Sequence, residues 1–377
     1  MKLSQIVLAP DSFKGTMTAD RVCEIMEGAI RRHLPGIRIH RVPMADGGEG
    51  LVEAALAVLR GVRKTARVQG PYGEEVEAPY ALLPDGRVVM EMASCAGLPL
   101  AQEQGRLDPL NASTYGVGQL LRIAKDGGAK EALLGLGGSA TNDGGIGMAA
   151  ALGYTFLDGN GEKLAPLAAN LQRIQGILPP EKPLGLQVTA ACDVDNPLTG
   201  PQGAAHTFGG QKGADEEMRK RLDAGLKQLA RAVVDCLGLE VDGIPGAGAA
   251  GGLGAGVLAF LGGSLTPGIQ LMLDAAGFEE KLVGADLVIT GEGRIDWQTA
   301  HGKVPCGVSG RAKKYGVPCI ALCGSIGEGV EAVYEQGITA VFSAVRGAGT
   351  FAEIQKSCEE DLRLLTDAVV RTLLIEG

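Results

Sequence analysis

The sequence predicts an α/β protein built on a doubly wound parallel sheet, with a large second α/β domain inserted into it. Short apolar runs of strand length alternate with amphipathic helical stretches at both ends of the chain, and each run ends in a glycine-rich or charged loop. The middle of the chain breaks this order with alternating strands and tight turns. Ligands of doubly wound sheets gather at the carboxyl ends of the strands, so the loops after the strands are the expected functional segments.

The N-terminal stretch predicts two successive strand–loop–helix units. A continuous apolar run at residues 6–9 indicates a buried strand, and the apolar residues of 19–34 recur at the spacing of a helix. A second strand over 37–42 leads through a glycine-rich loop to a helix over 51–59. The C-terminal third repeats the pattern, with strands expected over 285–290, 317–323 and 340–344 and helices over 307–315 and 351–375.

The middle of the chain predicts a separate domain. Turns at 70–73 and 84–87 bound short alternating strands, which is the pattern of β-hairpins. We therefore expect residues 1–67 and 285–377 to form one Rossmann-like domain and residues 68–284 to form an inserted α/β domain. A cleft between the two domains is the expected active site.

Composition and charge indicate an acidic cytoplasmic enzyme. The chain has 377 residues and a net charge of -9, and no run of Lys and Arg is longer than three, which argues against nucleic acid as a partner. No apolar run reaches membrane-spanning length, and the N-terminus does not resemble a signal peptide, so no membrane partner is expected. The eight cysteines form no C-x-x-C pair and no zinc-spaced cluster, so reduced thiols are expected. Monomer and homodimer both stay open.

The loop at 136–147 is the most distinctive segment, because glycines flank the short polar side chains of Ser139, Thr141 and Asn142. Glycine allows close approach of the backbone to a ligand, and the side chains offer donors, so the loop is suited to a phosphate or a carboxylate. A set of tight turns between core elements is the alternative interpretation.

Phosphoryl transfer requires cations, metal-binding carboxylates and a group that orients the attacking hydroxyl, and all three types recur in the predicted loops. The candidate cations are Lys14, Lys212, Arg294 and Lys303, and the candidate carboxylates are Asp11, Asp46, Glu49, Asp143, Asp193, Asp195, Glu292 and Asp296. Asp193 follows an apolar strand at 186–192 and is the stronger catalytic candidate, whereas Asp195 with Asn196 suits an Asx-turn. No Walker A motif exists, because the Gly-Lys pair at 302–303 is followed by valine and lacks the upstream glycine.

A formal G-x-G-x-x-G occurs at residues 246–251 and raises the alternative of a NAD-dependent dehydrogenase. A dinucleotide fingerprint follows a strong strand, but residues 239–244 are interrupted by charges and glycine. We expect a loop that leads into a helix over 253–261, with either its N–H groups toward phosphate or its glycines in close packing.

Six segments resemble, in the same order, the motifs of the bacterial glycerate kinase family over essentially the whole chain. They are 9–15 (APDSFKG), 45–50 (ADGGEG), 135–145 (GLGGSATNDGG), 193–198 (DVDNPL), 209–214 (GGQKGA) and 290–296 (TGEGRID). Trp297 stands where a small residue is expected, and Gly210 where proline is common. The resemblance implies a two-domain kinase that phosphorylates D-glycerate with ATP and Mg²⁺, with 2-phosphoglycerate favoured over 3-phosphoglycerate as the product.

The resemblance also suggests roles for the candidate residues. Asp193 would orient or deprotonate the hydroxyl, Glu292 and Asp296 would hold Mg²⁺, and Lys14 with Lys212 would neutralise phosphate or the glycerate carboxylate. The further candidates for contact with substrate or phosphate are Asp11, Ser12, Asp46, Ser139, Thr141, Asn142, Arg294 and Lys303. A sugar-acid sensor without turnover is the other alternative.

Overall fold

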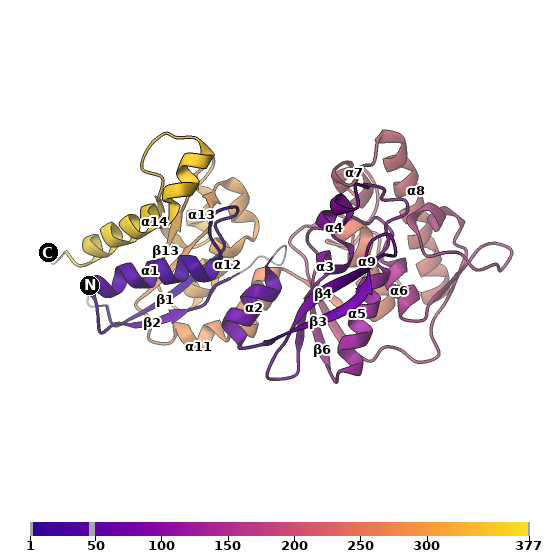
Figure 1. Cartoon of the computed structure of the whole chain (residues 1–377), viewed down its shortest axis with the longest axis horizontal. Helices are drawn as coiled ribbons and strands as arrows, with labels where there is room; N and C mark the ends of the chain where they lie inside the picture. Colours follow the sequence, from indigo (N-terminus) through magenta and orange to yellow (C-terminus); the bar gives the residue numbers. More distant parts are fainter. Residues whose placement is uncertain (1–2, 45–49, 376–377) are drawn as a thin grey trace. The chain divides into compact units, whose positions relative to one another are not determined.

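The computed structural model describes residues 3–44 and 50–375 and shows the α/β architecture with parallel sheets that the sequence predicts. Contacts divide the chain into two compact units. Unit 1 comprises Met1–Asp46, Ala57–Leu59 and Ile269–Gly377, and unit 2 comprises Gly47–Leu56 and Arg60–Gly268. Both ends of the chain therefore belong to unit 1 (Figure 1). The junctions expected from the sequence, after residues 67 and 284, lie farther along the chain than these.

A five-stranded parallel sheet in the order β15-β13-β11-β1-β2 forms the centre of unit 1. Its strands are β1 (Gln5–Pro10), β2 (Arg38–Arg41), β11 (Leu287–Gly291), β13 (Cys319–Cys323) and β15 (Ile338–Ser343). All residues of β1, β11 and β13 are buried, which explains why these strands are continuous apolar runs. Because Ile6 of β1 lies opposite Leu287 of β11, the two ends of the chain pair in this sheet.

Helices of unit 1 begin where the sequence provides caps. Thr18 accepts a hydrogen bond from the backbone of Arg21 at the start of α1, and Thr350 forms a capping box with Glu353 at the start of α14. The helices are α1 (Ala19–His33), α10 (Gly268–Ala275), α11 (Phe278–Leu282), α12 (Val304–Lys314), α13 (Ala332–Glu335) and α14 (Phe351–Leu373), with the 3₁₀ helix η3 (Trp297–His301) and the short parallel pair β12 (Arg294–Ile295) and β14 (Ser325–Ile326).

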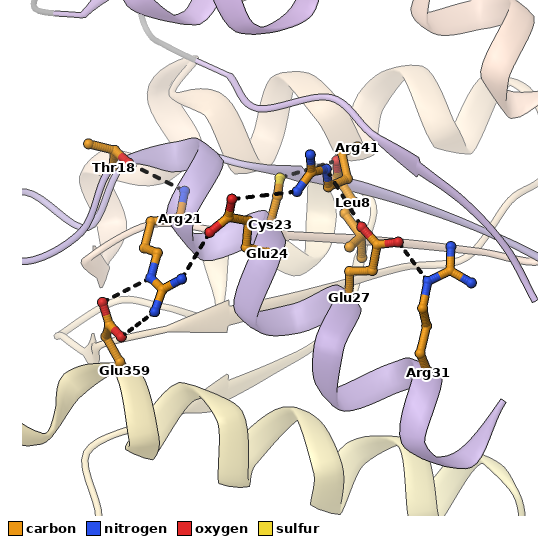
Figure 2. A network of polar contacts seen from close by, with 9 residues as sticks. All are labelled: Leu8, Thr18, Arg21, Cys23, Glu24, Glu27, Arg31, Arg41 and Glu359. Atoms are coloured by element: carbon orange, nitrogen blue, oxygen red, sulfur yellow. Dashed lines mark hydrogen bonds and ion pairs between the residues drawn. The ribbon is translucent and has the colours of Figure 1, made fainter. Parts of the chain in front are cut away.

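The helices α1 and α14 pack against each other and share a surface network of ion pairs (Figure 2). The Arg21 guanidinium lies between Glu24 of its own helix, at 2.9 Å, and Glu359 of α14, at 2.7 Å. These side chains are about half exposed, so solvent screens both pairs and they contribute little to stability. Buried apolar side chains such as Met26 and Leu362 hold the two helices on the sheet.

A six-stranded mixed sheet in the order β10-β9-β6-β5-β4-β3 forms unit 2. The strands β3, β4 and β5 are antiparallel, as the predicted hairpins require, and β5, β6, β9 and β10 are parallel. They span β3 (Val62–Gln69), β4 (Glu75–Leu82), β5 (Val88–Glu91), β6 (Glu131–Gly135), β9 (Gln187–Ala191) and β10 (Ser264–Thr266), and a separate hairpin joins β7 (Thr155–Leu157) to β8 (Gly176–Leu178).

Two apolar cores support unit 2. One involves the sheet and α5, and the other lies around α8 and α9, where Phe156 and Phe260 meet edge to face. The helical segments are α2 (Leu51–Leu59), within which the chain passes from one unit to the other, α3 (Ala93–Ala96), α4 (Leu98–Glu103), α5 (Tyr115–Asp126), α6 (Ile146–Ala151), η1 (Ala168–Arg173), α7 (Ala204–Phe208), η2 (Gly210–Lys212), α8 (Glu216–Leu237) and α9 (Ala249–Leu261). Within α9, residues 250–252 have positive φ, so the regular helix starts at Leu253, as predicted.

Two further expectations concern membranes and thiols. Among the residues that the structure describes, no helix is both long enough and apolar enough to cross a membrane. All eight cysteines are free, and six of them are buried, in line with the expected unpaired thiols. Burial raises the pKa of the Cys95 thiol to about 12, so this cysteine behaves as a small apolar residue at neutral pH.

Candidate functional site

The polar loop that follows β6 is held tightly inside unit 2. Gly138 lies in the left-handed region, and its carbonyl accepts a hydrogen bond from the Leu98 backbone at 2.8 Å. The next residue but one, Ala140, donates its N–H to the Ala96 carbonyl at 2.8 Å. As a result Ser139 and Thr141 are buried, although both are polar.

Lys212 reaches this loop from η2 and is itself buried. Its Nζ donates to Ser139 Oγ and to the Thr141 carbonyl, both at 2.7 Å. Burial lowers the pKa of Lys212 to about 7, and the neighbouring Asp143 carboxylate opposes that shift. Lys212, the expected cation for a phosphate or a carboxylate, is thus hydrogen-bonded to this loop. It lies 73 residues from Ser139 along the chain.

Asp143 fixes the far side of the loop through four hydrogen bonds. Thr114 donates its backbone N–H and its hydroxyl to Oδ2, each at 2.8 Å, and the backbones of Gly145 and Gly147 donate at 3.0 and 3.2 Å. Burial raises the pKa of Asp143, while these bonds favour its charged form. Thr114 is not among the residues that the sequence singles out. A threonine directly before the first residue of α5, Tyr115, stands at a helix N-cap position, which is the signal that could have identified it.

Two side chains of the loop contain buried polar atoms without a hydrogen-bond partner among the described residues. They are the hydroxyl of Thr141 and both amide atoms of Asn142. Unpaired buried polar groups are costly and uncommon in native proteins, so they indicate a place where polar ligand atoms can complete the bonding. Together with Lys212 and Ser139 they form the set that we call the polar cluster: Ser139, Thr141, Asn142 and Lys212.

The glycine-rich segment at 246–252, which includes the first residues of α9, packs against this loop and against the loop after β9. A Cβ on Gly251 would lie 2.0 Å from the Thr141 carbonyl, and a Cβ on Gly248 would lie 2.2 Å from the Pro197 carbonyl. Gly248 also donates its N–H to the Asn196 carbonyl at 3.0 Å. The glycines of the formal G-x-G-x-x-G therefore serve close packing of the chain on itself. Residues 239–248 contain no strand, as the sequence analysis expected.

Asp193 lies in the loop after β9, at the carboxyl edge of the unit 2 sheet where the sequence analysis places it. Asp193 is exposed, and its Oδ1 accepts a hydrogen bond from the backbone N–H of Gly268, the first residue of α10, at 2.9 Å. This bond fixes the orientation of a carboxylate that is open to solvent. The next loop residues are held separately, because Asn196 Nδ2 donates to the Gln202 carbonyl at 2.7 Å.

Unit 1 brings a second group of candidates together where β1, β11 and β13 end. Asp11 donates its backbone N–H to the Gly291 carbonyl at 2.8 Å, and its Oδ1 accepts from the Ser12 backbone at 2.6 Å. A Cβ on Gly293 would lie 3.3 Å from the Lys14 backbone nitrogen. Asp11, Ser12 and Lys14 therefore lie against the loop that carries Glu292 and Arg294. Asp46 lies outside the described residues.

Glu292 and Asp296 are both engaged with their own loop. The Thr299 hydroxyl donates to the buried Glu292 carboxylate. Asp296 caps η3, with Oδ1 accepting from the Gln298 backbone at 3.0 Å and Oδ2 from Arg294 Nε at 3.1 Å. The described residues contain no group of three or more His, Cys, Asp or Glu suited to a metal. Mg²⁺ in proteins is bound by one or two carboxylates together with phosphate oxygens, so Glu292 and Asp296 are the residues here that could hold it.

Lys303 stands at the N-cap of α12, and no side chain caps that helix. The first N–H groups of a helix attract anions, so this position suits a phosphate contact. In total, unit 2 unites the polar cluster and holds Asp193 on a neighbouring loop. Unit 1 unites Asp11, Ser12, Lys14, Glu292, Arg294 and Asp296, with Lys303 just beyond η3.

Comparison with known proteins gives consistent results over nearly the whole chain. The model of the glycerate kinase family matches residues 6–374. A glycerate kinase of Halalkalibacterium halodurans is 50% identical over 349 residues, which are 91% of either chain, and the glycerate 2-kinase of Escherichia coli strain K12 is 42% identical over 377 residues, covering 98% of either chain. A solved structure whose description names glycerate kinase 2 from Salmonella typhimurium LT2 matches with a TM-score of 0.87 at 40% identity, covering 99% of this chain and 98% of that one.

Proposed function

Because this chain belongs to the glycerate kinase family and is therefore a phosphotransferase, we propose that it transfers a phosphoryl group from ATP to the 2-hydroxyl of D-glycerate. The name of the Escherichia coli relative, glycerate 2-kinase, supports the choice of hydroxyl. The resemblance of six loop motifs supports the same activity. The product is then 2-phosphoglycerate.

The polar cluster of unit 2 is the proposed glycerate site, and its unpaired buried atoms are the observation that carries this assignment. Glycerate has a carboxylate and two hydroxyls on three carbons, so it can satisfy an amide, a hydroxyl and an ammonium at once. Thr141 and Asn142 provide the first two and Lys212 provides the third. A Mg²⁺-bound triphosphate is much larger and does not suit atoms buried this deeply. Because these atoms are buried, glycerate binding requires the loop to move.

Asp193 is the proposed general base or orienting group for the glycerate hydroxyl. It is an exposed carboxylate at the carboxyl end of β9, and the Gly268 N–H holds one of its oxygens. A positioned base of this kind contributes about 10²- to 10⁴-fold to turnover. Its loop neighbour Asn196 is tied to backbone and is not assigned a catalytic role.

The loops of unit 1 are the proposed ATP site. Lys14, Arg294 and Lys303 would neutralise phosphate oxygens, with Asp11 and Ser12 beside them, and Glu292 and Asp296 would hold Mg²⁺. When bound, Mg²⁺ neutralises charge on the phosphates and orients them. Acceptor and donor are thus assigned to different units. Asp46 stays a sequence-based candidate for contact with substrate or phosphate.

The identity of the product tests the choice of hydroxyl. Enolase converts 2-phosphoglycerate directly, whereas 3-phosphoglycerate must first be isomerised by phosphoglycerate mutase. We expect the reaction of the chain with ATP, Mg²⁺ and D-glycerate to couple to enolase without added mutase. Coupling that appears only after mutase is added would show 3-phosphoglycerate and overturn this part of the proposal.

A further inference from the structure

Trp297 is the only tryptophan in the chain, and the structure leaves it 53% exposed. It is the first residue of η3, separated from β12 by the cap residue Asp296, in the loop region that follows the buried strand β11. An indole offers 150–250 Å² of mostly apolar surface, so burial is its favoured state in a folded protein. A half-exposed indole at the carboxyl edge of a parallel sheet therefore lies where a ligand can cover it.

The segment at 327–329 holds the backbone and the Cβ of Trp297 in place. The Trp297 backbone donates to the Glu328 carbonyl at 3.0 Å, and a Cβ on Gly329 would lie 2.9 Å from the Trp297 Cβ. Two residues earlier, a Cβ on Gly327 would lie 2.7 Å from the Asp296 Cβ and 2.9 Å from Nε of Arg294. Residues 327–329 thus lie in close contact with Arg294, Asp296 and Trp297.

The elements next to Trp297 carry exposed apolar side chains and the Arg294 guanidinium, which pairs with Asp296. Ile326 of β14 is 45% exposed and Tyr334 of α13 is 44% exposed, and both elements adjoin the loop. On the charged side, the Arg294 side chain is 64% exposed. Along the chain, Lys303 follows η3 and its cap residue Gly302 and is the N-cap residue of α12.

We infer that Trp297 is the stacking platform for the adenine ring of ATP, with the phosphates directed toward Arg294 and Lys303. This inference rests on the proposed function, because it takes ATP as the donor. The flat face of an adenine ring matches an indole, and an adjacent guanidinium matches the phosphates. Glycerate has no apolar face to place there. Base stacking on aromatic side chains tolerates many bases, so the platform binds purines through ring area more than through hydrogen bonds.

The single tryptophan makes nucleotide binding directly observable. Selective excitation of tryptophan in the full chain, corrected for nucleotide absorbance with a free tryptophan derivative, reports only on Trp297. We expect ATP and ADP to quench its emission in a saturable way, CTP to quench more weakly, and inorganic tripolyphosphate or D-glycerate to leave it unchanged. Equal quenching by tripolyphosphate, or no saturable quenching by ATP, would overturn the inference.

Kinetics of two variants and one control test the same point. Stacking of a base contributes about 5- to 150-fold to binding, so Trp297→Ala is expected to raise the KM for ATP by that factor, with kcat and the KM for D-glycerate nearly unchanged. It should also reduce the preference for ATP over CTP. Trp297→Phe retains a ring and should restore most of the ATP affinity. Tyr315→Ala removes another exposed aromatic, at the opposite end of α12, and should change none of these values.

An unchanged KM for ATP in Trp297→Ala, in an active enzyme, would overturn the platform. The proposed function fails in a different way. If the unaltered chain forms no ADP with D-glycerate, the acceptor is wrong. Saturable quenching by ATP would still be measured and would still support the nucleotide platform.

Discussion

Replacement of Lys212 by methionine tests the buried ammonium of the polar cluster through the pH dependence of stability. Burial lowers the pKa of Lys212 from 10.5 to about 7, and unfolding returns the side chain to water and to its ordinary value. Between these two values the unfolded chain binds a proton that the folded chain has lost, so the free energy of unfolding rises with pH. The unfavourable contribution of this lysine is complete below pH 7 and disappears as the pH approaches 10.5.

With these two pKa values, the contribution of Lys212 changes by about 2 kcal/mol between pH 7 and pH 9. Lys212→Met lacks the titrating group. We therefore expect the unfolding free energy of the unaltered chain, minus that of the variant, to increase by about 2 kcal/mol over this interval. Urea unfolding followed by far-UV circular dichroism at several pH values measures the difference.

The matched control is Lys220→Met, which removes an exposed lysine of α8 in the same unit. The unfolding free energy of the unaltered chain, minus that of Lys220→Met, should stay nearly constant across the same pH range, because an exposed helical ion pair contributes little. If Lys212→Met follows the unaltered chain in parallel, as the control should, Lys212 is not a buried titrating group and the geometry of the polar cluster is wrong.

Three further predictions concern single positions. Gly251→Ala should lower the unfolding free energy by at least about 2 kcal/mol, because residue 251 has a φ of +69° and a Cβ there would lie 2.0 Å from the Thr141 carbonyl. Gly243→Ala is the control, because a Cβ at 243 meets open space. Equal stability of the two variants would contradict the packing around Gly251. Asp193→Ala should lower kcat by at least about 10²-fold with an unchanged circular dichroism spectrum, and near-normal turnover would remove Asp193 from the role of base. Arg21→Ala should leave the free energy of unfolding by heat or urea nearly unchanged, because its ion pairs are exposed, and a clear loss of stability would show that the network on α1 and α14 is a major source of stability.

The strands of unit 1 could be predicted because each of the central ones is buried on both faces. A strand such as β11 is then a continuous apolar run, and helices such as α1 are amphipathic and begin at a recognisable cap residue. Both signals are local, so a single sequence contains them. The predicted ends of these elements agree with the observed ones or differ by up to three residues, for example at α12, which begins at Val304 rather than at 307.

The expected junction after residue 67 lies beyond the start of unit 2, because the first half of β3 has no burial pattern that marks it as a strand. Of its eight residues only Ala66 and Val68 are buried, so residues 62–65 resemble a polar connection rather than the start of a sheet. The strand is defined by pairing with β4, where Val62 lies opposite Leu82. Pairing of this kind is a contact between segments, and a pattern confined to one segment does not reveal it.

The loops of the candidate site could be identified from the sequence, but their internal contacts could not. Glycines and short polar residues marked the segment around Ser139, and a strand followed by acids marked Asp193. The burial of Lys212 depends on Ser139 and Thr141, more than 70 residues away, and the need for glycine at 251 depends on the Thr141 carbonyl. These contacts arise only when the chain folds. The sequence alone therefore leaves two alternatives for residues 246–251, backbone N–H groups that bind a phosphate or glycines that allow close packing of the chain.

The rate of ADP formation from ATP, measured with and without D-glycerate, tests the central claim most directly. With Mg²⁺ and the full chain, we expect ADP to form in proportion to enzyme, to depend on D-glycerate in a saturable way, and to match the phosphoglycerate produced mole for mole. ADP formation that stays at the level seen without D-glycerate, under conditions where the chain is folded, would contradict the assignment of glycerate as the acceptor.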